Sequence, residues 1–160
     1  MFLDMKLFLL RHGRADWPRW SGPDDERPLT AEGIEEMRMV ARALKRLKIA
    51  PDAILSSPLP RALKTAEIVG KALGVRVEQR QELMPGFDGA GCDALLDAHP
   101  GADVMLVGHE PDFTGLIHSL TGGEVRLSKA GVAAVEIAGE LPAPRLLWLF
   151  PAKMLIRLYR

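Results

Sequence analysis

The sequence predicts an α/β fold, a three-layer sandwich in which helices flank a mostly parallel central sheet. Short, continuous apolar runs, typical of strands buried on both faces, recur along the chain. These runs alternate with stretches whose apolar residues have helical 3–4 spacing, and this order is typical of layered α/β proteins. The chain has 160 residues, the usual size of one domain. We therefore expect a single domain over residues 1–160.

The first predicted strand is the apolar run 7–10, which breaks at Arg11-His12-Gly13. Residues 14–28 contain prolines, tryptophans and charges without periodicity, so we expect a long loop there. A helix is predicted over 31–48, because Thr30 is a suitable N-cap and acidic residues precede basic ones along the segment.

A second strand and helix follow in the same order. The run 53–55 is the predicted strand, and apolar residues from Ala62 to Leu73 mark a helical face that ends at Gly74. Before the next buried strand we expect three short elements: a strand over 75–78, a Gly-rich loop over 82–91 and a helix over 93–99.

The last third of the chain contains one more predicted strand-helix unit, followed by a pair of predicted strands. A buried strand is predicted over 104–107, followed by a helix through Phe113 to Leu120. The runs 132–137 and 146–150, separated by a turn that contains proline, suit a strand pair at one side of the sheet. The chain shows no internal repeat.

Composition excludes several classes of protein. Basic and acidic residues number 21 each, so no net charge attracts nucleic acid or anionic lipid. The one cysteine, Cys92, cannot form an internal disulfide, which suits a reducing compartment. Charges interrupt residues 1–6, where a signal peptide would be apolar, and no apolar run approaches the ~20 residues of a membrane span. We expect a soluble, cytoplasmic monomer without nucleic-acid or membrane partners.

Polar residues with reactive side chains follow three of the predicted strands. They are Arg11-His12, Ser56-Ser57 with Arg61, and Gly108-His109. Because ligands of open α/β sheets bind beyond the carboxyl ends of the strands, we expect two arginines and two histidines to converge. The guanidinium fork matches phosphate oxygens, and a neutral imidazole serves as nucleophile or proton carrier. The set favours phosphoryl transfer.

The sequence lacks several other catalytic or binding motifs. Glu110 follows His109, but Phe113 stands where an H-E-x-x-H zinc site needs its second histidine. Neither a P-loop nor a G-x-G-x-x-G pattern after a strand is present. No arginine lies in the short segment after Cys92, so a cysteine-nucleophile phosphatase has no anion cradle and the thiol is expected to be a small buried side chain.

Four motifs, in this order along the chain, resemble the histidine phosphatase superfamily. They are Leu10-Arg11-His12-Gly13; Arg27-Pro28-Leu29-Thr30 with Gly33; Ser56-Ser57-Pro58 with Arg61-Ala62 and Thr65-Ala66; and Val107-Gly108-His109. The small size, the Arg-Pro-Leu-Thr segment and the Gly-His-Glu-Pro segment are most similar to the SixA-type phosphohistidine phosphatase branch. The resemblance implies a phosphoglycerate mutase-like fold.

The resemblance also implies a two-step hydrolysis without metal or cofactor. His12 would attack phosphorus to form a phosphohistidine, and water would then release phosphate. Arg11, Arg61 and His109 would hold the three non-bridging oxygens, with Arg27 contributing from the loop. Arg11 would also keep His12 neutral. The favoured substrate is phosphohistidine on a protein.

Each of these residues has a structural alternative. Either histidine could satisfy a backbone group, and Arg61 could form a surface ion pair. Arg27 suits a phosphate contact and a loop salt bridge equally; its acidic neighbours are Asp24, Asp25 and Glu26. Trp17 and Trp20 suit both a pocket wall and simple surface packing. His99 and His118 are expected to lie outside the site.

The proton donor stays open among Glu110, Glu82, Asp16 and solvent. Glu110 is slightly favoured by its position after His109 and is assigned to substrate binding, but Pro111 makes a helix-capping role equally suitable. All three carboxylates also suit ordinary solvated positions.

Rival functions also remain open. One is a small-molecule phosphomonoesterase of the same superfamily, or a mutase, which is disfavoured because so short a chain has little material for a lid that excludes water. The other is a non-catalytic phosphoprotein-binding module. The presence of both histidines and both arginines argues against a mere binder.

Overall fold

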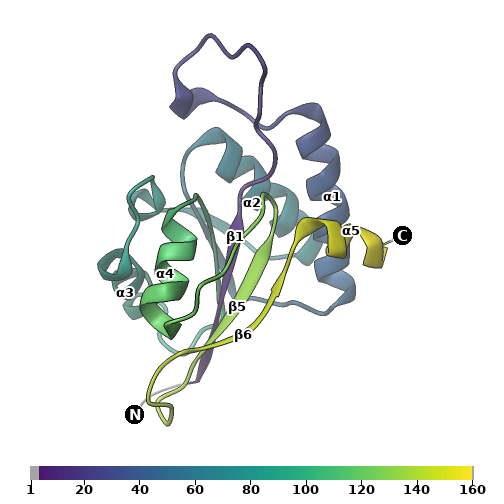
Figure 1. The fold of residues 1–160 in the computed structure, drawn as a ribbon. Helices are drawn as coiled ribbons and strands as arrows, with labels where there is room; N and C mark the ends of the chain where they lie inside the picture. Colours follow the sequence, from purple (N-terminus) through teal and green to yellow (C-terminus); the bar gives the residue numbers. More distant parts are fainter. Residues whose placement is uncertain (1–3, 160) are drawn as a thin grey trace.

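The computed structural model describes residues 4–159, which form one six-stranded sheet with helices on both faces (Figure 1). The strand order is β3-β2-β4-β1-β5-β6. The strands are β1 (Met5–Arg11), β2 (Ala53–Ser56), β3 (Val77–Gln79), β4 (Val104–Gly108), β5 (Val132–Ile137) and β6 (Arg145–Phe150).

The predicted α/β class is confirmed, and the sheet is mixed. Strands β1, β2, β3 and β4 pair in parallel, whereas β5 is antiparallel to both β1 and β6. Among the described strands β5 alone therefore runs against the others. The parallel part, which includes the two central strands, carries the sequence motifs.

Helices cover both faces of this sheet. On one face lie α1 (Ala31–Arg46), α2 (Pro60–Leu73) and α5 (Ala152–Tyr159), and on the other lie α3 (Gly89–Asp97) and α4 (Asp112–Thr121). Two 3-10 turns, η1 (Asp24–Glu26) and η2 (Gln81–Leu83), lie in the connections.

The central strand β1 explains the continuous apolar run. Phe8 and Leu10 pack in the cluster under α1 and α2, whereas Leu7 and Leu9 pack in the cluster under α3 and α4. Because both faces are covered, no position of the run can be polar. Each such side chain stabilises the fold by about 1.5–3 kcal/mol through burial.

Local signals set the ends of the two long helices. The Thr30 side chain accepts a hydrogen bond from the Gly33 amide (2.9 Å), so α1 begins where predicted. It ends at Arg46, two residues before the predicted end, and Lys48 beyond it has a positive φ of 58°. Helix α2 ends at Gly74, whose φ of 70° is the left-handed cap expected of glycine.

Short elements were predicted less well. The strand expected over 75–78 is Val77–Gln79, and the helix expected over 93–99 is Gly89–Asp97. That helix starts inside the expected Gly-rich loop because the Asp88 carboxylate caps it, accepting from the Gly91 amide (3.0 Å). Helix α5 was not predicted at all, since Ala152–Tyr159 is too short to show a clear period.

Cys92 is buried in the cluster under α3 and α4, and burial raises the pKa of its thiol to about 12. Within residues 4–159 no helix is both long and apolar enough for a membrane span. Residues 1–3, part of the segment expected to carry no signal peptide, lie outside the described residues.

Candidate active site

Three adjacent strands end at one edge of the sheet and bring two histidines together. The His12 amide donates to the Gly108 carbonyl (3.0 Å), and the Ser57 amide donates to the Val107 carbonyl (3.0 Å). These bonds continue the parallel ladders past the ends of β1 and β2. As a result the rings of His12 and His109 lie with centroids 5.3 Å apart.

His12 is held with one ring nitrogen free. Its Nδ1 lies 2.8 Å from the Gly13 carbonyl oxygen, an acceptor, so the proton is assigned to Nδ1 and the lone pair to Nε2. Burial is the main cause that lowers the pKa of His12 to about 4; the bond to Gly13 opposes this shift, and the charges of Arg61, Arg11 and Arg27 add to it. The imidazole is therefore neutral at pH 7, with Nε2 as a nucleophile.

Thr65 ties the loop after β1 to helix α2. Its hydroxyl accepts from the Gly13 amide (3.0 Å) and donates to the Arg61 carbonyl (2.8 Å). A side chain at position 13 would not fit, because a Cβ there would lie 2.8 Å from Cγ of Met37. Gly13 thus allows α1 to pack closely beneath the His12 loop.

His109 is oriented by Ser57. Their Nε2 and Oγ atoms lie 2.8 Å apart, and Ser57 Oγ also accepts from the Leu59 amide (3.2 Å). We assign the Ser57 hydroxyl as the donor in its bond to Nε2 of His109, which places the imidazole proton of His109 on Nδ1. Burial, followed by the nearby His12 and Arg61, lowers the pKa of His109 to about 3, so this ring is also neutral at pH 7.

Arg61 is the second residue of α2 and is 5% exposed. Its Nη1 donates to the Asp24 carbonyl (2.9 Å), and its Nη2 lies 3.5 Å from Oδ2 of the same residue. The predicted alternative, an ion pair, is present, and it joins the buried guanidinium to the exposed carboxylate of Asp24. Burial lowers the pKa of Arg61, and Asp24 opposes this shift.

Arg11 at the end of β1 donates from Nη1 to the Leu127 carbonyl (3.0 Å). Across residues 4–159, three buried side-chain nitrogens have no hydrogen-bond partner: Nε of Arg11, Nε of Arg61 and Nδ1 of His109. Buried donors are nearly always paired, so three in one site indicate that it accepts an anion. A tetrahedral oxyanion offers the acceptors these groups need.

Arg27 and Glu110 both make the structural contacts considered as alternatives. Arg27 forms an ion pair with Asp24 (Nε to Oδ1, 3.1 Å) and a hydrogen bond to the Ala15 carbonyl. The Glu110 carboxylate accepts from the Thr114 amide (3.1 Å) and hydroxyl, so it caps the first turn of α4. Arg27 nevertheless lies near enough for its charge to lower the pKa of His12.

The other two candidate acids are each paired with a basic side chain. Asp16 forms an ion pair with Lys129, and a hydrogen bond from that ammonium lowers the pKa of its carboxyl. Glu82 pairs with Arg80 (3.1 Å), whose hydrogen bond likewise lowers its pKa. Both are ionised at neutral pH and cannot donate a proton.

The remaining histidines lie outside this group. His99 bonds the Leu95 carbonyl (2.9 Å) at the end of α3, and His118 lies in the last turn of α4. Both positions agree with the prediction.

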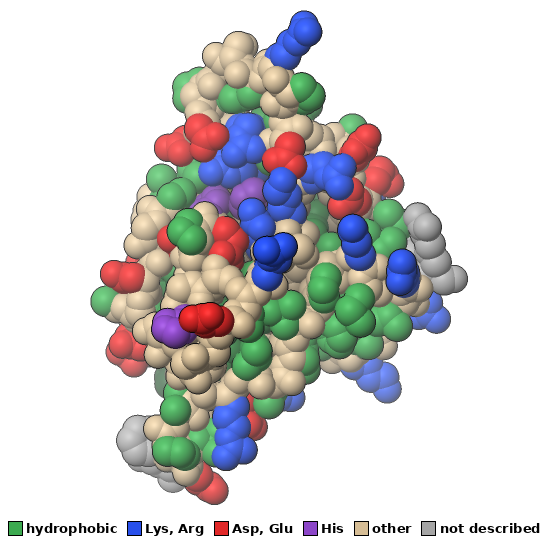
Figure 2. Space-filling view, viewed as in Figure 1, with side chains coloured by type: hydrophobic (Ala, Val, Ile, Leu, Met, Phe, Trp, Pro, Cys, Tyr) green, Lys and Arg blue, Asp and Glu red, His purple; other side chains and the backbone are tan. Residues whose placement is uncertain are grey.

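The predicted loop 14–28 lies above the site. Its two tryptophans donate hydrogen bonds from their indole nitrogens within the loop. Trp17 donates to the Pro28 carbonyl (2.8 Å), and Trp20 donates to the Pro23 carbonyl (2.9 Å). Both tryptophans line a shallow cavity next to Asp24 and Arg27. Figure 2 shows histidine and basic side chains gathered directly below this loop.

Sequence reasoning did not assign roles to Ser57 or Thr65, and it considered Asp24 only as a salt-bridge partner of Arg27. For Ser57 and Thr65 a signal existed, since Ser57 follows a strand end and Thr65 lies four residues after Arg61 in the same helix. Asp24 carried no such signal, because only the folded loop brings it to Arg61.

Comparison with known proteins identifies histidine phosphatases among the relatives of this chain. The family model "Histidine phosphatase superfamily (branch 1)" matches residues 7–85. An uncharacterised protein of Picosynechococcus is 39% identical over 140 residues, covering 80% of this chain and 82% of the relative. Phosphohistidine phosphatase SixA of Escherichia coli K12 is 36% identical over 125 residues, covering 75% and 76%.

Among solved structures, that of the protein histidine phosphatase SixA complexed with tungstate has a TM-score of 0.82. It is 30% identical to this chain, and the match covers 94% of this chain and 99% of that one.

Proposed function

Since the chain belongs to the histidine phosphatase superfamily, in its SixA-type branch, and is thus a phosphatase, we propose that it removes the phosphoryl group from phosphohistidine on a protein. The transfer proceeds through a covalent intermediate on His12. The SixA relatives carry the protein-phosphohistidine activity in their names, and one of them was solved with tungstate, a tetrahedral oxyanion like phosphate.

One observation carries the mechanism: His12 donates from Nδ1 to the Gly13 carbonyl and keeps a low pKa of about 4. An imidazole is a nucleophile only through an unprotonated nitrogen. The bond to Gly13 makes that nitrogen Nε2, and burial keeps it free of a proton at neutral pH.

In the first step Nε2 of His12 attacks phosphorus as the P–N bond of the substrate breaks. The bonding electron pair leaves with the substrate imidazole, which is protonated from solvent. Arg11, Arg61 and His109 donate hydrogen bonds to the three non-bridging oxygens, whose charge must be stabilised during transfer. Their unpartnered nitrogens, Nε of each arginine and Nδ1 of His109, are the donors for this task.

In the second step water attacks the phosphorus on His12. The P–N bond to Nε2 breaks, its electron pair returns to the imidazole, and the proton of the water passes to the departing phosphate. The histidine regains its starting state, so the cycle needs no other reactant.

The leaving group favours phosphohistidine over alkyl phosphate esters. An alkoxide needs a positioned acid, but Asp16 and Glu82 are ionised in ion pairs and Glu110 caps α4. An imidazole has a pKa near 6.5, so solvent can protonate it near neutral pH. A site without a dedicated acid is suited to this substrate.

The test is to trap the intermediate. The protein is mixed with a radiolabelled phosphohistidine peptide, denatured within milliseconds and mapped for acid-labile, alkali-stable phosphate. We expect label on His12, none in His12→Ala, and unchanged labelling in His118→Ala, a matched control on α4.

Two results would refute the proposal. One is turnover by His12→Ala at the rate of the wild type, and the other is phosphate that binds to the wild-type protein without ever becoming covalently attached. The second result is the behaviour of a phosphoprotein-binding module.

A further inference from the structure

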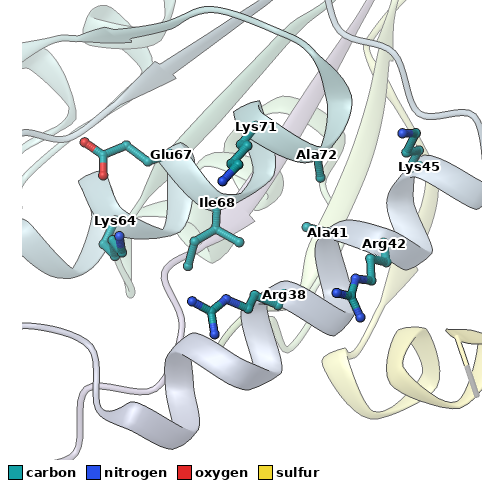
Figure 3. Close-up of a pocket in the computed structure, with 9 residues that line it drawn as sticks. All are labelled: Arg38, Ala41, Arg42, Lys45, Lys64, Glu67, Ile68, Lys71 and Ala72. Carbon is teal, nitrogen blue, oxygen red and sulfur yellow. The ribbon is translucent and has the colours of Figure 1, made fainter.

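A basic groove runs between α1 and α2 on the outer surface of the protein (Figure 3). Its basic residues are Arg38, Arg42 and Lys45 from α1 and Lys64 and Lys71 from α2. Its apolar floor is formed by Ala41, Ile68 and Ala72.

The charge of this groove is only partly compensated. Glu67 is the one acidic residue that lines it, and Figure 3 shows its carboxylate pointing away from α1. Arg38 pairs with Glu35 on its own helix, but Lys45, Lys64 and Lys71 form no ion pair within residues 4–159. In a chain whose formal net charge is zero, this is a concentrated positive surface.

The basic residues form two rows along the groove. Positions 38, 42 and 45 follow helical spacing on α1, and positions 64 and 71 do so on α2. Seven residues of helix span about 10.5 Å, so the rows extend over about two turns. Two parallel cationic rows with an apolar strip between them match an acidic helix with apolar residues along one face.

The floor allows a helix to approach closely. Ala41 and Ala72 have small side chains, and Ile68 lies between Arg38 and Lys71 (Figure 3). A third helix can thus pack its ridge into the groove between α1 and α2. The surface holds no aromatic side chain on which a nucleotide base could stack.

The groove begins next to the active site. Both helices start at the carboxyl edge of the sheet: Thr30 before α1 bonds the Arg14 carbonyl (3.0 Å), and α2 starts three residues after Ser57. Lys64 follows Arg61 by three residues, about 4.5 Å along the helix axis. A protein bound in the groove therefore extends to the site.

We propose that this groove docks an acidic, amphipathic helix of the phosphoprotein substrate, a role that rests on the function proposed above. Charge complementarity selects the partner, and the nearby site receives its phosphohistidine. This contact supplies a recognition element that the phosphoryl group alone cannot supply.

The test uses binding without catalysis. The probe is a fluorescent helical peptide of about 20 residues, long enough to be helical alone, with Ala and Leu on one face and Glu along both sides of it. A second peptide has the same composition with Glu spread evenly around the helix. Fluorescence anisotropy is measured at low salt on the His12→Ala protein, so binding is read independently of turnover.

Two double variants provide the comparison. Lys64→Glu with Lys71→Glu cancels the net positive charge of the groove-lining residues. Arg76→Glu with Arg145→Glu makes the same charge change at exposed positions elsewhere. We expect the first to weaken binding of the patterned peptide about tenfold or more and the second to have little effect. Made in the protein that retains His12, both double variants should hydrolyse p-nitrophenyl phosphate like the wild type.

Several outcomes would overturn the docking role. The first is an equal loss of affinity for the patterned peptide in the two double variants. The second is equal affinity of the His12→Ala protein for the two peptides, and the third is tighter binding of inorganic polyphosphate than of the patterned peptide. Because none of them depends on phosphoryl transfer, a failure here is distinguishable from a failure to trap phosphate on His12.

Discussion

Nε2 of His109 and Oγ of Ser57 lie 2.8 Å apart, which joins the residue after β4 to the residue after β2. This one bond orients the ring of the second histidine, and with the Ser57 hydroxyl as donor it leaves the imidazole proton on Nδ1. In the proposed mechanism this Nδ1 proton is the one that His109 donates to the transferred phosphoryl group.

Replacement of Ser57 by alanine should therefore reduce kcat. With its hydroxyl gone, His109 loses the bond that holds the proton on Nδ1, and we expect kcat to fall about tenfold, the value of one hydrogen bond. Steady-state hydrolysis of p-nitrophenyl phosphate measures kcat, and nitrogen NMR reports the tautomer. Ser119→Ala, at an exposed position of α4, serves as the control; an unchanged tautomer in Ser57→Ala would contradict the assignment.

Arg61→Ala should lower kcat/KM by about 100- to 1000-fold, because a charged donor to the transferring oxygens is lost from a buried site. Arg61→Lys should recover only part of this loss, since an ammonium lacks the planar fork. The measurement is kcat/KM for a phosphohistidine peptide, with Arg76→Ala as the surface control. Unchanged kinetics in Arg61→Ala would remove this residue from the site.

Stability should fall as the pH decreases from about 6.5 toward 4. The folded pKa values of His12 and His109 are lowered to about 4 and about 3, from 6.5, so in this range the unfolded chain binds more protons. Each histidine then reduces the free energy of unfolding by up to about 1.4 kcal/mol per pH unit. Urea unfolding at pH 7 and pH 5 tests this.

The variant His12→Gln with His109→Gln is the reference for that measurement. It should lose much less stability than the wild type between pH 7 and pH 5, because neither replaced side chain titrates. Equal losses in the two proteins would show that other groups cause the effect.

Leaving-group chemistry predicts an order of substrates. Phosphohistidine peptide and p-nitrophenyl phosphate, whose leaving groups need little help, should be hydrolysed faster than sugar phosphates by at least about 100-fold, the usual contribution of a general acid. A panel measured in one buffer tests this order. Faster hydrolysis of a sugar phosphate would favour a small-molecule phosphomonoesterase and leave the His12 intermediate standing.

The positions of the two site histidines could be predicted because a strand buried on both faces appears in the sequence as a continuous apolar run. Runs such as 7–10 and 104–107 are apolar throughout, so the first polar residues after them mark the carboxyl edge of the sheet. His12 and His109 follow directly. Their closeness then depends only on the pairing of β1 with β4.

Tertiary contacts could not be predicted in the same way. Asp24 meets Arg61 only because the loop 14–28 folds back over α2, and no local pattern encodes that return. The roles of Glu110 and Arg27 stayed open for a related reason: a carboxylate before a helix, or a guanidinium in an acidic loop, suits two partners equally until the fold selects one. Helix α5 was missed because its eight residues are stabilised by packing on α1.

The contact of Asp24 with Arg61 also bears on how a catalytic cycle ends. A site with several phosphate donors risks holding its product, so that free phosphate in the cell would keep it occupied. The Asp24 carboxylate lies 3.5 Å from Nη2 of Arg61 and pairs with Arg27 as well. In the proposed mechanism we expect this carboxylate to compete with inorganic phosphate for the guanidinium of Arg61, whereas a phosphoryl group bonded to His12 is held covalently. We therefore expect this internal competitor to favour departure of the phosphate product.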